Sequence, residues 1–219
     1  MHDPHPTKKC LICRSSIYQD DSISYFVVRD TDVICGKCRR LLKPYPYPCR
    51  GEILYLYDDF LRNLLFQFKG QGDLALAPVF LNGQVERLKR RYRQMIIVPA
   101  PSVESENQER GFVHLVEMFR SLDLPIYPVL YKKYPYKQAT QSWQGRQAVW
   151  DVIGIHDAWL IKDKRILLVD DVMTSGMTLE ACEARLHQAG ARSVSRLVIA
   201  SGRKKTRFHG RWKNMRKER

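Results

Sequence analysis

Residues 166–178, which read Ile-Leu-Leu-Val-Asp-Asp-Val-Met-Thr-Ser-Gly-Met-Thr, decide the fold of this chain. The stretch begins with four apolar residues, Ile166–Val169, which predict a strand buried on both faces, as in a parallel sheet. Two adjacent carboxylates, Asp170 and Asp171, close this strand, and a polar loop follows them. Apolar side chains at helical spacing then predict a helix that ends near Gly190, a typical helix-terminating residue.

A strand, a loop rich in hydroxyl groups and a helix together make an anion-binding site. The free N–H groups of the first helical turn and the helix dipole both favour a phosphate group. The loop residues that would contact this phosphate are Thr174, Ser175, Gly176, Met177 and Thr178. The two carboxylates would repel a phosphate held directly against them, so they suit the hydroxyls of a sugar or a magnesium ion.

The stretch resembles the phosphoribosyl pyrophosphate (PRPP) signature of type I phosphoribosyltransferases. The resemblance implies that Asp170 and Asp171 hold the 2′- and 3′-hydroxyls of ribose and act as the catalytic pair. It also implies that residues 174–178 wrap the 5′-phosphate. The alternative is an ordinary buried strand that ends in a polar turn. Paired acids followed by Thr-Ser-Gly-x-Thr at a strand-to-helix junction favour the phosphate site.

The composition indicates a globular α/β protein. The chain has 219 residues, of which 44% are hydrophobic, enough for one domain with a core and a small appendage. No stretch of about 18 apolar residues occurs, so no membrane-spanning helix is expected. The first residues lack the apolar core of a signal peptide, and we expect a cytoplasmic protein.

The net charge of +14 is concentrated in two places. The tail 203–219 holds nine Lys or Arg and one Glu, which makes +8, and a second basic run covers residues 87–93. Such clusters predict binding to nucleic acid, since Phe208 and Trp212 in the tail could stack on bases. The alternative is a solvated tail that maintains solubility. The candidate nucleic-acid-binding residues are Arg87, Lys89, Arg90, Arg91, Arg93, Arg203, Lys204, Lys205, Arg207, Arg211 and Lys213.

Four cysteines near the start of the chain have the spacing of a zinc site. Two Cys-x2-Cys pairs, Cys10 with Cys13 and Cys35 with Cys38, are separated by 21 residues. Four thiolates complete a tetrahedron and leave no position for water, so we expect a structural Zn²⁺ in a ribbon or knuckle with a small hairpin. Cys49 lacks a partner at suitable spacing and is interpreted as a free thiol.

These features divide the chain into three parts. We expect a zinc-binding domain over residues 1–48, a phosphoribosyltransferase-like domain over 49–202 and a basic tail over 203–219. The boundary at 48 follows from Lys43-Pro-Tyr-Pro-Tyr-Pro48, whose prolines favour an extended, stiff connector.

Within the second part, strands alternate with helices. The hydrophobic pattern predicts strands at 51–57, 95–98, 126–130, 166–169 and 194–200, and helices at 58–70, 74–91 and 112–119, besides the helix after the phosphate loop. We expect a partly mobile flap at 131–147. Such alternation predicts a mostly parallel sheet with helices on both faces. Ligands lie beyond the carboxyl ends of such strands, where residues 99–102 and 170–178 are both expected.

The combination of motifs resembles the ComF family. Besides the four cysteines and the PRPP signature, the motifs are Phe66-x-Phe68-Lys69-Gly70, Val98-Pro-x-Pro101-Ser102 and Arg110-Gly111-Phe112. The similarity covers residues 10–200. It implies a role in uptake of transforming DNA, together with a helicase-like ATPase from the same operon and single-strand handling proteins.

The resemblance also implies that Pro101, Ser102 and Arg110 form the pyrophosphate loop. This chain departs from the family in that loop, because Glu104, Glu106 and Glu109 stand where family members carry basic residues. An acidic loop repels pyrophosphate unless magnesium intervenes.

Two classes of function remain open. The first is a phosphoribosyltransferase that displaces pyrophosphate from PRPP with Mg²⁺ and transfers the ribose to an unidentified base. The second is a competence accessory protein that binds single-stranded DNA and keeps PRPP as a ligand. We favour the second for the cellular role, since a fold alone does not decide function.

Overall fold

The computed structural model describes residues 8–18, 31–102, 104–133 and 152–202. Its elements are α1 (Gly36–Leu41), β1 (Glu52–Leu56), α2 (Asp59–Leu65), the π-helix η2 (Phe66–Gly70), the 3-10 helix η3 (Leu74–Leu81), α3 (Val85–Tyr92), β2 (Ile96–Pro99), α4 (Glu104–Arg110), α5 (His114–Phe119), the 3-10 helix η4 (Arg120–Leu122), β3 (Leu130–Lys132), β4 (Ile153–Ile155), the 3-10 helix η5 (Ala158–Leu160), β5 (Arg165–Met173), α7 (Met177–Gln188) and β6 (Ser193–Ser201).

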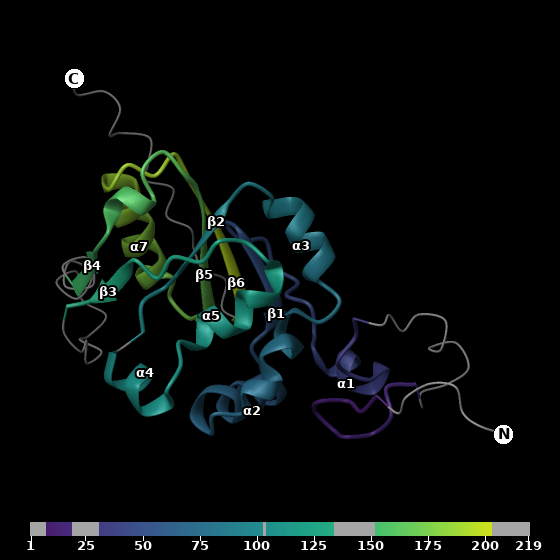
Figure 1. Cartoon of the computed structure of the whole chain (residues 1–219). Helices are drawn as coiled ribbons and strands as arrows, with labels where there is room; N and C mark the ends of the chain where they lie inside the picture. Colours follow the sequence, from purple (N-terminus) through teal and green to yellow (C-terminus); the bar gives the residue numbers. More distant parts are fainter. Residues whose placement is uncertain (1–7, 19–30, 103, 134–151, 203–219) are drawn as a thin grey trace.

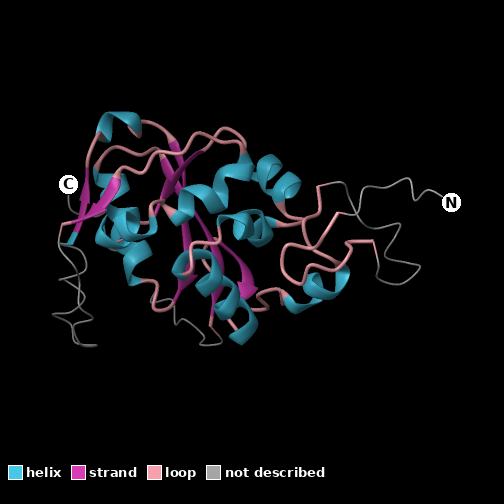
Figure 2. Cartoon of the chain, turned by 60° about the horizontal axis from the view of Figure 1, so that its bottom comes forward, coloured by secondary structure: helices cyan, strands magenta, loops and turns pink. Residues whose placement is uncertain are grey.

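A four-stranded parallel sheet forms the centre of the fold, in the order β1-β6-β5-β2. The four residues Ile166–Val169 of β5 are completely buried. The strands β6 and β2 flank this central strand, and helices cover both faces of the sheet. Figure 1 shows α7 on one side of the strands and α3 on the other, and Figure 2 shows helices around the magenta strands. The predicted α/β fold is therefore confirmed.

The helix after the phosphate loop agrees with its sequence pattern. The side chains of Leu179, Cys182 and Leu186 face the core of the protein and are at most 1% exposed. Gly190 follows α7 with a φ of +90°, a conformation that glycine adopts without the steric cost of a side chain. Burial of this apolar face fixes α7 against β5 and β6, and so fixes the loop that precedes it.

The predicted helix over 74–91 is two helices. Residues 74–81 form the 3-10 helix η3 and α3 begins at Val85, with a turn between them. Pro78 lies inside η3 and has no N–H to donate, and Gly83 has a φ of +73° that an α-helix does not permit.

The predicted strand over 126–130 is wrong in its position. Ile126 makes an isolated parallel bridge to Ile97, and the strand β3 begins only at Leu130, where it pairs antiparallel with β4. Pro125 and Pro128 cannot donate to a sheet ladder, which explains the interruption. Most of the predicted flap, 134–147, lies outside the described residues.

The proline-rich connector is extended, as its composition predicts. It runs antiparallel to β1: the amide of Tyr45 donates to the carbonyl of Leu54 at 3.0 Å, and that of Leu56 donates to the carbonyl of Lys43 at 2.8 Å. Of the predicted hairpin, residues 23–28 lie outside the described part, and Val33 and Ile34 are not in a strand. Ile34 is buried in the same hydrophobic core as the sheet.

Candidate functional site

The carboxyl ends of β2 and β5 lie next to each other, as expected for the candidate site. The two strands are neighbours, with Pro99 in register with Val169, and the amide of Ala100 donates to the carbonyl of Val169 at 2.8 Å. The strand β5 does not stop at the two carboxylates but continues to Met173. Asp170 and Asp171 therefore lie within the strand, just before the loop.

The carboxylate of Asp171 lies in a network of basic groups. This residue is only 7% exposed, and its Oδ2 accepts a hydrogen bond from Lys69 Nζ and lies 3.3 Å from His114 Nε2. Burial alone would raise the pKa of Asp171, but the hydrogen bond from His114 and the charge of Lys69 outweigh it and hold the pKa below its usual range. Asp171 is consequently ionised at neutral pH.

Arg110 sets the orientation of the His114 ring. Its guanidinium NH1 lies 3.3 Å from His114 Nδ1, and because a guanidinium only donates, Nδ1 is the acceptor. The hydrogen on Nε2 then faces Asp171. A chain of contacts thus runs from Arg110 through His114 to Asp171.

Asp170 has a different environment. Successive side chains of a strand point to opposite faces of the sheet, so Asp170 faces away from His114. Its Oδ1 accepts the amide of Asp171 at 2.9 Å. Burial and the negative charge of Asp171 raise the pKa of Asp170 to about 8, against the opposing effect of Lys69 and Lys132. The two adjacent carboxyl groups are therefore not equivalent.

The predicted phosphate loop joins β5 to α7. Thr174 and Ser175 are exposed, and Gly176 precedes the helix with a φ of +81° that favours glycine. The amide of Met177 lies 3.5 Å from Ser175 Oγ. The amides of the first turn of this twelve-residue helix and the exposed hydroxyl groups of the loop can therefore bind the same anion.

The predicted pyrophosphate loop is helical over most of its length. Pro101 is buried and Ser102 is half-buried, and the helix α4 follows at 104–110. Arg110 ends this helix and contacts Asn107 Oδ1 at 3.5 Å, in addition to His114. The structure thus places Arg110 in the network around Asp171.

Our sequence reasoning did not assign Lys69 or His114 to the site. Lys69 belongs to the Phe-x-Phe-Lys-Gly motif, and this motif was the available signal; in the structure it forms the π-helix η2, which follows β1 and α2. His114 begins α5, which follows β2. Neither contact with Asp171 has a local signature in the sequence.

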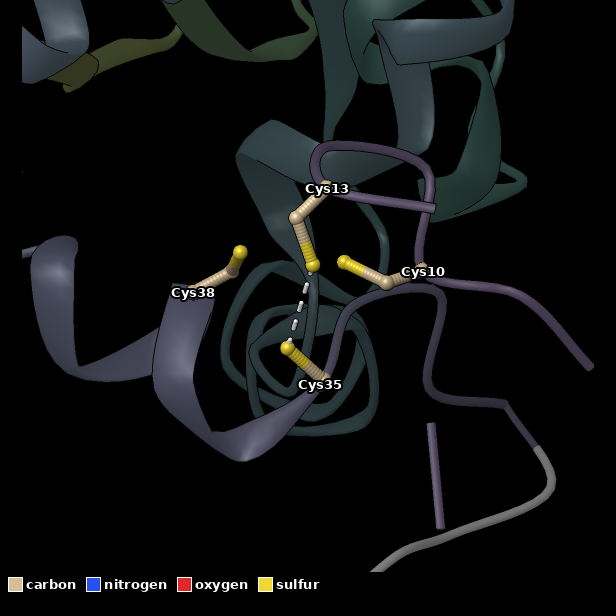
Figure 3. A group of neighbouring side chains, drawn as sticks. All are labelled: Cys10, Cys13, Cys35 and Cys38. Carbon is tan, nitrogen blue, oxygen red and sulfur yellow. Dashed lines mark hydrogen bonds between the residues drawn. The ribbon is translucent and has the colours of Figure 1, made fainter. Parts of the chain in front are cut away.

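The four predicted metal-binding cysteines lie together, as Figure 3 shows. The sulfur atoms of Cys10, Cys13, Cys35 and Cys38 all lie within 4.8 Å of one another, and those of Cys13 and Cys35 are 3.7 Å apart. Tetrahedral zinc with Zn–S bonds of about 2.3 Å requires sulfur–sulfur distances of about 3.8 Å. The donor set therefore fits a metal ion. Hydrogen bonds from Ser15 lower the pKa of Cys13 to about 6, whereas burial raises the pKa of Cys35.

The basic residues of α3 lie near the amino ends of the strands, whereas the phosphate loop follows the carboxyl end of β5. Arg87 and Arg91 both pair with Glu52, at 2.5 and 3.3 Å, and Glu52 is the first residue of β1. Lys89 lies 3.9 Å from Asp123, and Arg90 and Arg93 are exposed. The candidate residues of the tail lie outside the described part.

Among the described residues, the structure contains no helix with the length and apolarity needed to cross a bilayer.

The comparisons with known proteins agree with this arrangement. The phosphoribosyl transferase domain model matches residues 108–218. Competence protein ComFC of Streptococcus pneumoniae is 25% identical over 146 residues, which make up 64% of this chain and 63% of that protein. The chain thus spans less than two thirds of that relative. Adenine phosphoribosyltransferase of Nitrosospira multiformis is 31% identical over 128 residues, or 58% of this chain and 70% of the enzyme.

Solved structures of phosphoribosyltransferases are also similar. The purine phosphoribosyltransferase of Pyrococcus horikoshii is 24% identical, with a TM-score of 0.37, over 57% of this chain and 73% of that one. The adenine phosphoribosyltransferase of Thermoanaerobacter pseudethanolicus is 15% identical, with a TM-score of 0.39, over 60% of this chain and 83% of that one. From the matched domain and the parallel sheet, the chain belongs to the phosphoribosyl transferase domain family, and its similarity to ComFC and its four clustered cysteines fit a ComF-type protein.

Proposed function

We propose that this protein is a ComFC-like competence accessory protein that binds PRPP with Mg²⁺ and handles single-stranded transforming DNA in the cytoplasm. The observation that carries the proposal is the strand–loop–helix unit 165–188, which brings two adjacent acidic residues, hydroxyl groups and first-turn helix amides to the carboxyl end of β5. Similarity to ComFC over 64% of the chain supports the link to competence.

In this proposal each group of the site has one role. Asp170 and Asp171 bind the ribose hydroxyls, and the loop 174–178 binds the 5′-phosphate. Pro101, Ser102 and Arg110 lie beside the pyrophosphate. Bound Mg²⁺ would neutralise the pyrophosphate charge, which an acidic segment such as 104–109 otherwise repels.

Lys69 and His114 also have a role in this proposal, because they prepare the carboxylate of Asp171 for the ribose. Their contacts with Asp171 keep it ionised and oriented before PRPP arrives. A carboxylate held in place gives up less conformational entropy when a sugar binds.

The cysteine segment and the basic residues serve the second part of the proposal. Cys10, Cys13, Cys35 and Cys38 hold a structural Zn²⁺ in a domain over residues 1–48, ahead of the transferase-like domain over 49–202. The basic residues of 87–93 and of the tail 203–219 contact DNA phosphates, with little preference for sequence. The expected partners are a helicase-like competence ATPase and single-strand handling proteins.

The second candidate function is an active phosphoribosyltransferase. It is favoured by the 31% identity to an adenine phosphoribosyltransferase over 70% of that enzyme. In this case the PRPP site is the same, and the protein also binds an acceptor base and releases pyrophosphate.

One experiment separates the two functions. Calorimetry with PRPP and Mg²⁺ measures binding, and a pyrophosphate assay with and without adenine measures turnover. Binding of PRPP without sustained pyrophosphate release supports the accessory protein, and adenine-dependent release supports the enzyme. If PRPP does not bind, both functions of this site are wrong. Binding of a fluorescent poly-dT oligonucleotide, measured at several salt concentrations, tests DNA handling separately.

A further inference from the structure

A cavity of about 410 Å³ lies between the cysteine segment and the start of α3. It is lined by residues of three parts of the fold: the cysteine segment, the turn from η3 into α3, and η4. In Figure 1, α3 is on the right and the cysteine segment with α1 lies below it. No residue of the phosphate loop lines this cavity, so it is separate from the PRPP site. The polar and charged lining residues are Lys8, Thr31, Asn82, Glu86, Lys89 and Ser121.

Asn82 is a buried donor without a partner in this cavity wall. It is 7% exposed, and its Oδ1 accepts the amide of Val33 at 2.7 Å, which identifies Nδ2 as the donor atom. Within the described ranges, Nδ2 has no hydrogen-bond partner, and neither does the hydroxyl of Ser121. Because buried polar groups are normally hydrogen-bonded, such a donor indicates that an acceptor is missing.

The amino end of α3 adds further donors to the same wall. This helix has eight residues, its first-turn residues Val85 and Glu86 line the cavity, and Gln84 provides no side-chain cap. First-turn amides have no acceptor within their helix, and the helix dipole favours an anion there. Lys89 brings a positive charge one turn further on, whereas the carboxylate of Glu86 opposes an anion.

We propose that this cavity binds a phosphate group. The donors are Nδ2 of Asn82, the first-turn amides of α3 and the ammonium group of Lys89. The phosphate comes either from the backbone of single-stranded DNA or from a free phosphate-bearing ligand, since both present the same oxygen atoms. The site does not depend on PRPP binding.

The test is a titration of the full-length ¹⁵N-labelled protein with inorganic phosphate, followed by NMR. We expect saturating shifts of the Asn82 side-chain amide and of the backbone amides of 85–87. Shifts of the amides of 174–178 report separately on the PRPP loop. If phosphate leaves the signals of Asn82 and 85–87 unchanged, the proposal is wrong.

Asn82→Asp tests the donor directly. The variant keeps an acceptor for the amide of Val33 but replaces the donor by a negatively charged oxygen, so the affinity of this cavity for phosphate falls by roughly tenfold or more. Asn63→Asp, which makes the same charge change at an exposed position of α2, keeps the native affinity. If Asn82→Asp binds phosphate as tightly as the native protein, the proposal is overturned.

A second variant covers the case in which Asn82→Asp does not fold. Lys89→Gln lowers the affinity for phosphate several-fold, while Lys164→Gln, an exposed lysine that does not line the cavity, leaves it unchanged. Equal effects of the two lysine variants would mean that only net charge matters and would overturn the site.

A poly-dT oligonucleotide distinguishes the two sources of phosphate. If it shifts the same signals and competes with inorganic phosphate, the cavity holds the DNA backbone. If phosphate binds and the oligonucleotide does not, the cavity holds a free phosphate-bearing ligand. Either result supports a phosphate site, and the PRPP assay remains an independent measure of the proposed function.

Discussion

At the scale of single residues, the charge of Asp171 makes the stability of the protein depend on pH. Its folded pKa is lowered by His114 and Lys69, so its contribution to folding is present above the unfolded pKa of about 4 and is lost as pH falls through the folded pKa. Asp171→Asn is expected to reduce the free energy of unfolding at pH 7 by about 1–3 kcal/mol, since Lys69 and His114 lose a charged partner.

The measurement is urea unfolding of both proteins between pH 2 and pH 7. The difference between them should shrink as pH falls below about 4, because the unfolded chain takes up a proton there that the native carboxylate, with its lowered pKa, does not yet bind. Asp59→Asn is the matched control, because the side chain of Asp59 is 88% exposed. A constant difference down to the acid limit would contradict the low pKa of Asp171.

Asp170 should show the opposite sign. Its raised pKa means that the folded protein keeps this proton up to about pH 8, whereas the unfolded chain releases it near pH 4. Stability therefore falls as pH rises through this window. Asp170→Asn keeps the oxygen that accepts the amide of Asp171 and should raise the melting temperature at pH 8 while it weakens PRPP binding. A lower melting temperature at pH 8 would refute this sign.

How far the site could be predicted differs between these residues. The acidic pair and the loop 174–178 follow from a local pattern, because a strand, a turn and a helix amino end are all encoded within about 20 residues. The contacts of Lys69 and His114 with Asp171 depend on how α5 and η2 pack beside β5, and their sequence separation leaves no periodic signal. The pKa values of Asp170 and Asp171 differ because the two side chains lie on opposite faces of one strand, and only Asp171 contacts His114 and Lys69.

At the scale of elements, the amino end of α2 depends on one capping residue. The carboxylate of Asp58 accepts the amide of Leu61 at 3.1 Å and also pairs with Lys43 at 3.0 Å. Asp58→Ala should lower the free energy of unfolding by about 1 kcal/mol, the usual cost of a lost helix cap. Asp59→Ala, one position later and exposed, should have less effect. Equal losses in chemical denaturation would show that Asp58 does not cap the helix.

The packing of α7 on β6 includes a buried ion pair. Arg196, 5% exposed, donates from Nε to Glu183 at 2.8 Å, and Arg50 reaches the same carboxylate at 2.5 Å. Glu183→Ala leaves Arg196 buried without a partner and should cost about 3–5 kcal/mol in chemical denaturation. Glu180→Ala, on the exposed face of the same helix, serves as the control. A loss below about 1 kcal/mol at Glu183 would mean that Arg196 finds another acceptor.

The elements that the sequence predicts well are those with strong local signals. The strands at 96–99, 165–173 and 193–201 each contain a run of apolar residues, and they form where these runs predict them. The predicted single helix over 74–91 is wrong because Pro78 has no N–H to donate and Gly83 takes a positive φ that an α-helix does not permit.

At the scale of the whole molecule, the cysteine segment and the sheet share one hydrophobic core. Cys10, Ile17 and Ile34 belong to the same buried cluster as the strands. Because four thiolates close this segment, removal of a bound metal should affect the stability of the whole chain and not only its first residues. We therefore expect Cys10→Ser to lower both the metal content and the melting temperature of the full-length protein.

The experiment compares Cys10→Ser with Cys49→Ser, a change at a cysteine outside the four-sulfur cluster. Elemental analysis should give one zinc per chain for the native protein and for Cys49→Ser, and less for Cys10→Ser. The chelator 1,10-phenanthroline should lower the melting temperature of the native protein and of Cys49→Ser toward that of Cys10→Ser, since a metal that binds only the folded state stabilises it by mass action. Full zinc content in Cys10→Ser, or a native melting temperature that the chelator does not change, would contradict a metal site built from these four sulfur atoms.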